Sequence, residues 1–337
     1  MDKHAAKKAI AVLHGAGYAG RELIRILLRH PQAALATVTS RTFAGKPLHH
    51  AHPDLRGITA MVFSDPTSLD VPDLDGVLIA AEHGTGVRAV TDLLGRGFDG
   101  AIVDLSADFR LRDPAGYARW YGFEHPAPEL VPQFAYGLAE ITAPYTTSRI
   151  ANPGCFATGI ALALHPLQQV LPSYHAYITA LTGASGSGTR PKATTHFPAR
   201  DSNVRAYKVL QHQHLPEVMQ LLPKETVVSL VPVSGPWTRG IWGTIQLSTP
   251  LQGSAHDLAE LYDRHYGHAP LVRLWPGRLP ELRYAVGTPF CDIGWVINGE
   301  ELVIGFALDN LLKGAASQAI QNLNAVLGMA PLAGLLE

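Results

Sequence analysis

An apolar strand, a glycine turn and an amphipathic helix follow one another directly near the start of the chain. The strand pattern is Lys8 to Leu13, the turn is His14-Gly15-Ala16-Gly17-Tyr18-Ala19-Gly20, and the helical pattern is Arg21 to Arg29, stopped by Pro31. This order constrains the fold because it is typical of the first unit of a doubly wound parallel sheet that binds a dinucleotide. A turn with a purely structural role is the alternative.

The glycines of the turn have the spacing G-x-G-x-x-G. The first permits the tight turn, the second lets a pyrophosphate approach the backbone, and the third lets the helix pack close to the strand. We therefore expect the dinucleotide to contact Gly15, Gly17, Tyr18, Ala19 and Gly20.

The second strand, Ala34 to Thr39, ends in Ser40 and Arg41. An NAD-binding unit commonly carries an acidic residue there for the ribose 2′-hydroxyl, whereas a hydroxyl and a cation suit a 2′-phosphate. Ser40 and Arg41 therefore predict NADP(H) as the cofactor. The alternative for Arg41 is a solvated loop charge.

Two further apolar runs, Gly76 to Ala81 and Ala101 to Leu105, continue the parallel sheet. A polar stretch that ends at Arg110 follows the second run, at the carboxyl end where open α/β sheets bind ligands. Arg110 is thus a candidate substrate ligand, although Asp108 and Arg110 could instead form a structural ion pair.

The strand pattern changes after residue 150. Longer apolar strands follow one another: His175 to Thr182, Thr226 to Val233, Gly240 to Ser248, and a hairpin of Asp292 to Ile297 and Glu301 to Leu308 around Asn298-Gly299. Strands that neighbour one another in this way predict an α+β domain with a mixed or antiparallel sheet. We expect an NADP-binding Rossmann-type α/β domain at 1–150, completed by a C-terminal helical segment at 310–337, and a catalytic and oligomerisation domain at 151–309.

Cys155 lies between a short strand pattern and an apolar helical pattern that runs from Phe156 to Leu164. Pro153 and Gly154 break the strand, which puts the sulfur at a helix N-terminus. Unpaired amides and the helix dipole stabilise a thiolate there, so Cys155 is a candidate nucleophile. A small buried core residue is the alternative.

Two later stretches carry polar groups of catalytic type. The glycine loop from Thr182 to Arg190 contains Ser185 and Gly186, whose hydroxyl and amide could surround a phosphate or carboxylate. A flexible connection would have the same composition. His212 and His214 precede a helix that begins at Pro216, and a neutral imidazole at a helix N-terminus is suited to relay a proton.

The composition limits the classes of partner. The formal net charge of -1 over 337 residues gives no reason to expect a nucleic acid or a membrane surface. Two distant cysteines and the lack of an apolar run of ~18 residues favour a cytoplasmic protein with reduced thiols. The cluster His49-His50-Ala51-His52 lies in a loop without paired cysteine spacing, and no metal is expected.

A nicotinamide-binding half together with a thiolate and a histidine pair indicates hydride transfer to an acyl group, because a carboxyl derivative must first become a thioester to accept hydride. The sequence resembles the N-acetyl-gamma-glutamyl-phosphate reductases, the arginine-biosynthetic relatives of aspartate-semialdehyde and glyceraldehyde-phosphate dehydrogenases, over nearly the whole chain. The motifs are Gly17-Tyr18-Ala19-Gly20-Arg21-Glu22-Leu23, Asp104 to Arg110, Asn152-Pro153-Gly154-Cys155, Thr182 to Gly188, His212-Gln213-His214-Leu215-Pro216-Glu217 and Asn310-Leu311-Leu312-Lys313-Gly314-Ala315-Ala316.

The resemblance implies a covalent mechanism. Cys155 would attack the γ-acyl phosphate of an N-acylglutamyl phosphate, phosphate would leave, NADPH would reduce the thioester, and His212 or His214 would activate the thiol and protonate the oxyanion. It implies cofactor contacts at Gly17, Gly20, Ser40, Arg41 and Asn310. The expected substrate-binding residues are Arg110, Asn152, Ser185 and Gly186.

Two positions depart from the family pattern. His14 replaces the first glycine of the family's common turn, and Gln213 stands between the histidines where the family usually has an arginine. The first departure leaves open which amides hold the pyrophosphate. The second removes one possible substrate cation.

Two other functions remain open on the sequence alone. One is the lysine-pathway reductase of an aminoadipyl phosphate linked to an acidic carrier protein, which Ser40 to Gly45 and Asp54-Leu55-Arg56-Gly57 resemble. The other is a catalytically silent NADP-binding redox regulator. The family resemblance also implies a homodimer or homotetramer formed through the sheet of the second domain.

Overall fold

The structure is a computed structural model that describes residues 6–248 and 255–336, and it divides into two compact units. Unit 1 comprises the residues up to Arg112, His125–Pro153 and the residues from Ala315 onward. Unit 2 comprises Asp113–Glu124 and Gly154–Gly314. The predicted ranges 1–150, 151–309 and 310–337 stay a prediction.

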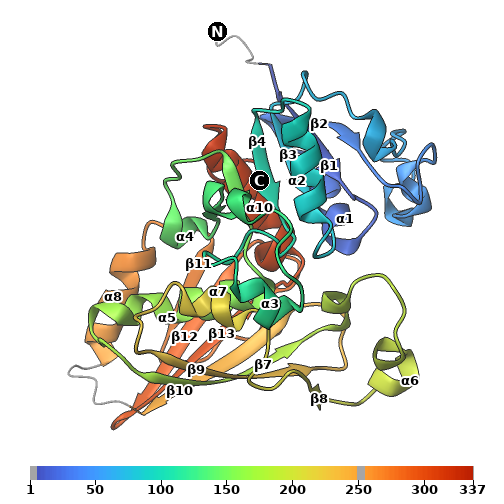
Figure 1. Ribbon diagram of the computed structural model, residues 1–337. Coiled ribbons are helices and arrows are strands. Elements are labelled where there is room, and N and C mark those ends of the chain that lie inside the picture. The colour runs from blue at the N-terminus through green and yellow to red at the C-terminus, as the bar shows by residue number, and fades with distance from the viewer. Residues whose placement is uncertain (1–5, 249–254, 337) are drawn as a thin grey trace. The chain divides into compact units, whose positions relative to one another are not determined.

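Unit 1 contains a six-stranded sheet in the order β2-β1-β3-β4-β6-β5, and all of its paired strands are parallel (Figure 1). Its strands are β1 (Lys8–Leu13), β2 (Ala33–Val38), β3 (Gly76–Ile79), β4 (Ala101–Asp104), β5 (Ala135–Tyr136) and β6 (Arg149–Ala151). The residues of β3 and β4 are buried throughout, as expected for parallel strands covered on both faces. The predicted Rossmann-type parallel sheet is confirmed.

The helices of unit 1 are α1 (Tyr18–Leu27), α2 (Gly86–Gly95), α4 (Ala139–Thr142) and α10 (Ser317–Val326). The buried residues of α1 include Leu23, Ile24 and Leu27, which is the apolar face that an amphipathic helix turns to a sheet. The last helix, α10, packs against β4 and α1. A short 3-10 helix, η1 (Leu48–His50), and a second, η2 (Pro53–Leu55), follow β2.

Unit 2 contains a seven-stranded mixed sheet in the order β11-β12-β13-β10-β7-β9-β8. Its strands are β7 (His175–Thr182), β8 (Arg205–Ala206), β9 (Val227–Ser234), β10 (Ile241–Ser248), β11 (Val272–Pro276), β12 (Cys291–Asn298) and β13 (Glu301–Leu308). The β12 and β13 strands pair antiparallel, which confirms the hairpin predicted at Asn298-Gly299. The predicted mixed sheet is also confirmed, because β7 pairs parallel with β9 and antiparallel with β10.

The helices of unit 2 are α3 (Gly116–Tyr121), α5 (Cys155–Leu164), α6 (Phe197–Arg200), α7 (Leu215–Met219), α8 (Ala255–Tyr266) and α9 (Leu282–Ala285). Every residue of α5 after Cys155 is buried, and the helix packs on β13 and β12. Gly159 allows this close packing, because a Cβ there would lie 2.4 Å from the Phe306 ring. The β13 strand leads into a π-helix at Leu312–Ala316. In the described parts of both units, none of the helices combines the length and the apolar character that crossing a membrane requires.

Candidate active site

The glycine turn of unit 1 connects β1 to α1. A Cβ on Gly20 would lie 2.4 Å from the carbonyl oxygen of Gly15, so only glycine lets α1 begin this close to the turn. At Gly17, the N-cap of α1, a Cβ would meet no described residue other than its two chain neighbours within 4 Å. A close helix start with open space beside its first amides is what a pyrophosphate site at a helix N-terminus requires.

The end of β2 places a cation beside this turn. Arg41 is exposed, and its charge adds to burial, the larger cause, in lowering the pKa of His14. Ser40 is buried, and its hydroxyl accepts the Phe43 N–H at 3.3 Å. His14 has a φ of 57° and donates its N–H to the Thr39 hydroxyl at 3.2 Å. Unit 1 therefore has a neutral imidazole, His14, after its first strand and a permanently charged arginine, Arg41, after its second.

Two predicted substrate ligands of unit 1 are held by structural hydrogen bonds. Arg110 is 6% exposed and donates to the carbonyl oxygens of Asn152 at 2.8 Å and of Leu105 at 2.7 Å. The Asn152 side chain donates to the Ala315 carbonyl and accepts from Asn322. The structure thus brings Arg110 and Asn152 together.

Two aspartates of the stretch before Arg110 accept hydrogen bonds within unit 1: Asp104 accepts the N–H and hydroxyl of Ser106, and Asp108 accepts N–H groups at the start of α2. Asp108 accepts the N–H groups of Gly84 at 2.7 Å and of Val87 at 2.9 Å. Asp104 is fully buried, and burial, together with the charge of Asp108, raises its pKa to about 7. Both carboxyl groups therefore serve the packing of unit 1.

Cys155 is the first residue of α5 in unit 2 and is partly accessible. Gly154 is the N-cap and offers no side-chain oxygen to the first amides of the helix. Those amides and the positive end of the helix dipole favour the thiolate. Cys291, in contrast, is completely buried in β12.

Glu217 connects the histidine pair to the residue before the thiol. Its carboxylate is fully buried, and Oε2 accepts the Gly154 N–H at 2.8 Å. Its Oε1 lies 4.0 Å from His214 Nε2 and accepts the Tyr121 hydroxyl at 3.4 Å. A Cβ on Gly154 would lie 2.4 Å from His214 Nε2, so the imidazole packs directly on the backbone beside Cys155.

His212 supports this arrangement as a neutral group. Its Nδ1 accepts the His214 N–H at 3.2 Å, and its ring packs edge-on against Phe156. Burial, and then the charge of His214, lower the pKa of His212 to about 2. Both predicted histidines therefore lie together beside Phe156, the residue after Cys155.

Two contacts at the thiol were not foreseen from the sequence. The Tyr207 ring packs edge-on against His212 with the centroids 5.8 Å apart, and burial and the negative charge of Cys155 raise the pKa of its phenol. A Cβ on Gly314, in the π-helix, would lie 2.7 Å from Cys155 Cβ. The glycine therefore permits the close approach of a segment 159 residues later in the chain. Single-turn π-helices often occur at functional sites, so the π-helix itself indicates that this segment belongs to the candidate site.

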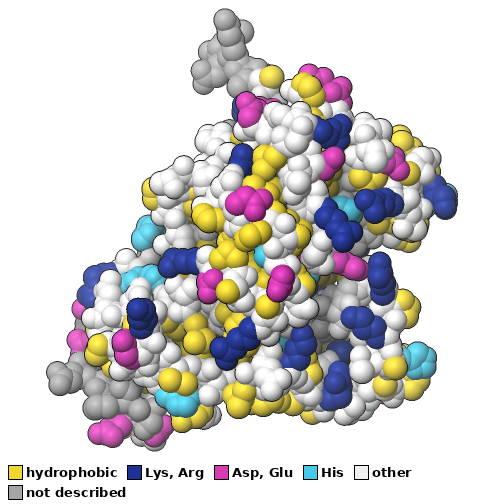
Figure 2. Space-filling model, viewed as in Figure 1, with side chains coloured by type: hydrophobic (Ala, Val, Ile, Leu, Met, Phe, Trp, Pro, Cys, Tyr) yellow, Lys and Arg dark blue, Asp and Glu magenta, His cyan; other side chains and the backbone are white. Residues whose placement is uncertain are grey.

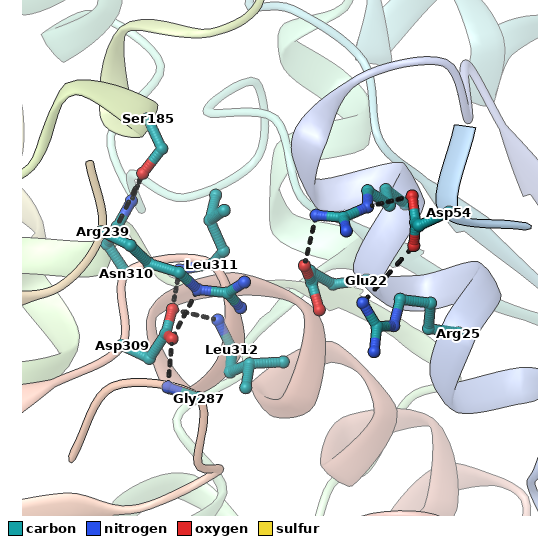
Figure 3. Close-up of polar contacts among 11 residues, drawn as sticks. Glu22, Arg25, Asp54, Ser185, Arg239, Gly287, Asp309, Asn310, Leu311 and Leu312 are labelled. Carbon is teal, nitrogen blue, oxygen red and sulfur yellow. Dashed lines mark hydrogen bonds and ion pairs between the residues drawn. The ribbon is translucent and has the colours of Figure 1, made fainter. Parts of the chain in front are cut away.

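Asn310 and Ser185, predicted for different ligands, are hydrogen-bonded to one another in unit 2 (Figure 3). Asn310 Nδ2 donates to Ser185 Oγ at 3.0 Å, and Asn310 Oδ1 accepts the Gly240 N–H at 2.6 Å. Gly186 is exposed beside them, and a Cβ there would lie 3.6 Å from Thr182 Oγ1. The adjacent Asp309 is buried, pairs with Arg239 and accepts the Gly287 N–H. This network orders the loop that carries the polar groups.

Comparisons with known proteins agree on one family. Residues 9–148 match the family model described as the NAD binding domain of semialdehyde dehydrogenase, and residues 155–310 match its dimerisation domain. The LysW-L-2-aminoadipate 6-phosphate reductase of Deinococcus radiodurans is 38% identical, over 98% of this chain and 97% of that protein. The N-acetyl-gamma-glutamyl-phosphate reductase of Methanopyrus kandleri is also 38% identical, over 97% of this chain and 98% of that protein.

Solved structures share the fold at low sequence identity. Aspartate semialdehyde dehydrogenase II from Vibrio cholerae superposes with a TM-score of 0.72 at 14% identity, over 96% of this chain and 99% of that chain. Aspartate semialdehyde dehydrogenase with NADP from Candida albicans gives a TM-score of 0.69 at 14% identity, over 96% and 99% of the two chains.

Proposed function

Because the chain belongs to the semialdehyde dehydrogenase family of oxidoreductases, we propose that it reduces N-acetyl-gamma-glutamyl phosphate to N-acetylglutamate 5-semialdehyde with NADPH, in arginine biosynthesis. The observation that carries the proposal is the placement of Cys155 at the start of α5, where Glu217 and His214 pack against the preceding residue. Relatives named N-acetyl-gamma-glutamyl-phosphate reductase, which match 97% of this chain, support the choice of substrate.

The covalent step uses the Cys155 thiolate. Its sulfur forms a bond to the acyl carbon, the bond from that carbon to the phosphate oxygen breaks, and inorganic phosphate leaves with the electron pair. After hydride addition, the carbon–sulfur bond of the thiohemiacetal breaks, which releases the aldehyde and regenerates the thiolate. The helix dipole of α5 stabilises that thiolate both as the attacking nucleophile and as the leaving group.

His214 is proposed to move the protons, and Glu217 to position it. A buried carboxylate near Nε2 favours the imidazole tautomer with a hydrogen on that nitrogen. The other ring nitrogen then carries the lone pair that can take the thiol proton, give a proton to the oxyanion formed by hydride addition, and take it back when the thiohemiacetal collapses to the aldehyde. His212 stays neutral and holds the His214 backbone.

Unit 1 is proposed to hold the cofactor, which when bound supplies the hydride. The residues present fit a dinucleotide because the open position at Gly17 and the close packing at Gly20 leave the first amides of α1 accessible. Arg41 would neutralise a 2′-phosphate, Ser40 would bond to it, and Tyr18 and Ala19 would lend the first amides of α1. Arg110, Asn152, Ser185 and Gly186 remain the proposed substrate ligands, and Asn310 a proposed cofactor ligand.

The test is phosphate- and NADP-dependent oxidation of N-acetylglutamate 5-semialdehyde, the reverse reaction. Cys155→Ala should lower kcat by about a thousandfold or more while the Kd for NADP stays unchanged, as is typical for loss of a nucleophile. Cys291→Ala, which removes the other thiol, is the matched control and should keep its activity. An active Cys155→Ala protein would refute the covalent mechanism, and an inactive wild type that still binds NADP would favour a silent regulator.

A second candidate is reduction of an aminoadipyl phosphate carried by an acidic protein. Residues 190–208 contain five Lys and Arg residues and one acidic residue, although the whole chain has a net charge of -1. Figure 2 shows Lys and Arg side chains gathered over the loop that carries α6, whose Phe197 is 75% exposed. Such a surface suits an acidic protein. Comparing kcat/KM for the N-acetyl, N-succinyl and carrier-linked substrates decides between the candidates.

The protein is proposed to form a homodimer or homotetramer, and the sheet of unit 2 is the proposed contact surface between subunits. Tyr177 is 54% exposed, Val227 50% and Val296 41%, and they lie on β7, β9 and β12. Alternation along β7 buries the other face of the sheet. An apolar sheet face of this kind is stabilised when a second copy covers it. Light scattering should give the mass of a dimer or tetramer, and Tyr177→Lys should reduce it.

A further inference from the structure

His52 is a buried histidine of unit 1 that reaches the glycine turn from outside it. The residue is 3% exposed and stands directly before η2. Its Nε2 lies 2.8 Å from the carbonyl oxygen of Gly15, 37 residues earlier in the chain. Because a carbonyl oxygen only accepts, Nε2 carries the hydrogen and donates it.

The Gly15 carbonyl and the Ala16 N–H belong to the same planar peptide group, so the direction of one sets the direction of the other. In a planar trans peptide, the carbonyl of Gly15 and the N–H of Ala16 point in opposite directions. A hydrogen bond that fixes the carbonyl therefore fixes the Ala16 N–H as well. Because Gly15 has no Cβ, its backbone dihedrals are less restricted than those of other residues, and a hydrogen bond to its carbonyl narrows the orientations of this peptide.

The other contacts of the turn show what depends on the orientation of this carbonyl. The Gly15 N–H donates to the Thr39 carbonyl at 2.9 Å, which fixes the entry to the turn. The same carbonyl oxygen of Gly15 contacts the first turn of α1, since a Cβ on Gly20 would lie 2.4 Å from it. A rotated Gly15 carbonyl would thus disturb both the turn and the start of α1.

The segment that carries His52 is anchored independently of its imidazole. Leu48 and Leu55 are buried in the core of unit 1. Asp54 accepts hydrogen bonds from Arg21 at 2.8 Å and from Arg25 at 3.4 Å on the exposed side of α1 (Figure 3). Loss of the imidazole donor alone should therefore leave the segment in place.

Burial is the largest cause that lowers the pKa of His52. The imidazole therefore stays neutral near pH 7, with its one hydrogen committed to Gly15. The donor therefore adds no positive charge beside the turn.

We propose that His52 is a positioning residue for the pyrophosphate of the dinucleotide: its Nε2–H locks the Gly15–Ala16 peptide in the orientation that presents the turn amides. The proposal rests on dinucleotide binding by unit 1 and deepens the proposed function. It gives one member of the cluster His49-His50-Ala51-His52 a role that needs no metal. In the part of the chain that the structure describes, no group of three or more His, Cys, Asp or Glu side chains is arranged to hold a metal ion.

The test compares direct binding of NADPH by His52→Phe, His52→Gln and the control His50→Phe, followed by cofactor fluorescence without acyl substrate. If the competent peptide orientation falls to about a tenth of the population, the Kd for NADPH rises about tenfold. Phe keeps the ring without the donor, whereas Gln can place an N–H near the position of Nε2 and should restore most of the affinity. His50 is exposed in the same segment, and its replacement should change nothing.

Adenosine 2′-phosphate, which has no pyrophosphate, provides the second measurement by competition. Its Kd should be the same for the wild type and for His52→Phe, because the turn amides are not engaged. An unchanged NADPH Kd in His52→Phe would overturn this role alone, and so would an equal loss of affinity for adenosine 2′-phosphate. A wild-type protein that binds no dinucleotide would overturn this role and the proposed function together.

Discussion

Replacing Glu217 by glutamine tests whether the buried carboxylate positions the catalytic histidine. The side chain keeps its size, so the packing of unit 2 should persist. The carboxylate now accepts the Gly154 N–H at 2.8 Å and lies 4.0 Å from His214 Nε2. In the variant, the amide oxygen can still accept the Gly154 N–H, and the amide N–H groups then face His214 or Tyr121.

Two losses follow from this exchange. The variant lacks the carboxylate charge 4.0 Å from His214 Nε2 that stabilises the imidazolium formed when the thiol proton is taken, a difference of about 1.5 kcal/mol in the transition state or about tenfold. An amide donor facing His214 Nε2 favours the opposite tautomer, which moves the lone pair away from its working nitrogen, and we assign this about another tenfold. We therefore expect kcat/KM to fall about 100-fold, mostly in kcat.

The assay is the phosphate-dependent oxidation of the semialdehyde, measured with a pH profile and with the Kd for NADP. Glu225→Gln, which changes an exposed carboxylate of the same unit, is the matched control and should behave as the wild type. The melting temperature of Glu217→Gln should stay within about 3 °C of the wild type. A variant with normal kcat would refute the positioning role, and one that has lost NADP binding and stability together would show a merely structural one.

Three further predictions follow from close contacts and one buried charge. Gly20→Ala should weaken NADPH binding, because its Cβ would lie 2.4 Å from the Gly15 carbonyl oxygen. Gly95→Ala should not, because outside its chain neighbours and the backbone of α2 no described atom lies within 4 Å of its Cβ. Gly314→Ala should lower kcat without changing the Kd for NADPH, because its Cβ would press on Cys155 Cβ at 2.7 Å; an unchanged kcat would remove the π-helix from the account. Burial raises the pKa of Asp104 to about 7, so the folded protein keeps a proton that the unfolded chain releases near pH 4, and stability falls as the pH rises from about 4 to 7. The melting temperature of Asp104→Asn, relative to the wild type, should therefore rise across that interval, and a constant difference would contradict the buried charge.

The sequence predicted those elements that are specified by residues close together in the chain. The strand, turn and helix at the dinucleotide site and the hairpin at Asn298-Gly299 were predicted because glycine spacing and strand alternation are local properties. Boundaries were less accurate: α1 begins at Tyr18, before the predicted Arg21, because the turn residues already adopt helical geometry. The predicted C-terminal helical segment at 310–337 contains a π-helix and then α10, a division that hydrophobic periodicity does not reveal.

The contacts that organise the candidate site depend on residues far apart in the chain. Glu217 meets Gly154 across 63 residues, and His52 meets Gly15 across 37. Periodicity carries no information on such pairs, because they arise from the packing of whole elements. One signal was available: Glu217 follows His214 by three residues at the start of a helix, which puts both side chains on one face.

The central claim is that Cys155 becomes acylated, and mass spectrometry of the protein tests it most directly. The wild type is mixed with N-acetyl-gamma-glutamyl phosphate in the absence of NADPH, quenched in acid and digested. The account predicts an N-acetylglutamyl thioester on the peptide that contains Cys155, which disappears when NADPH is added before the quench. An unmodified Cys155 peptide in protein that turns over the same substrate would contradict the account.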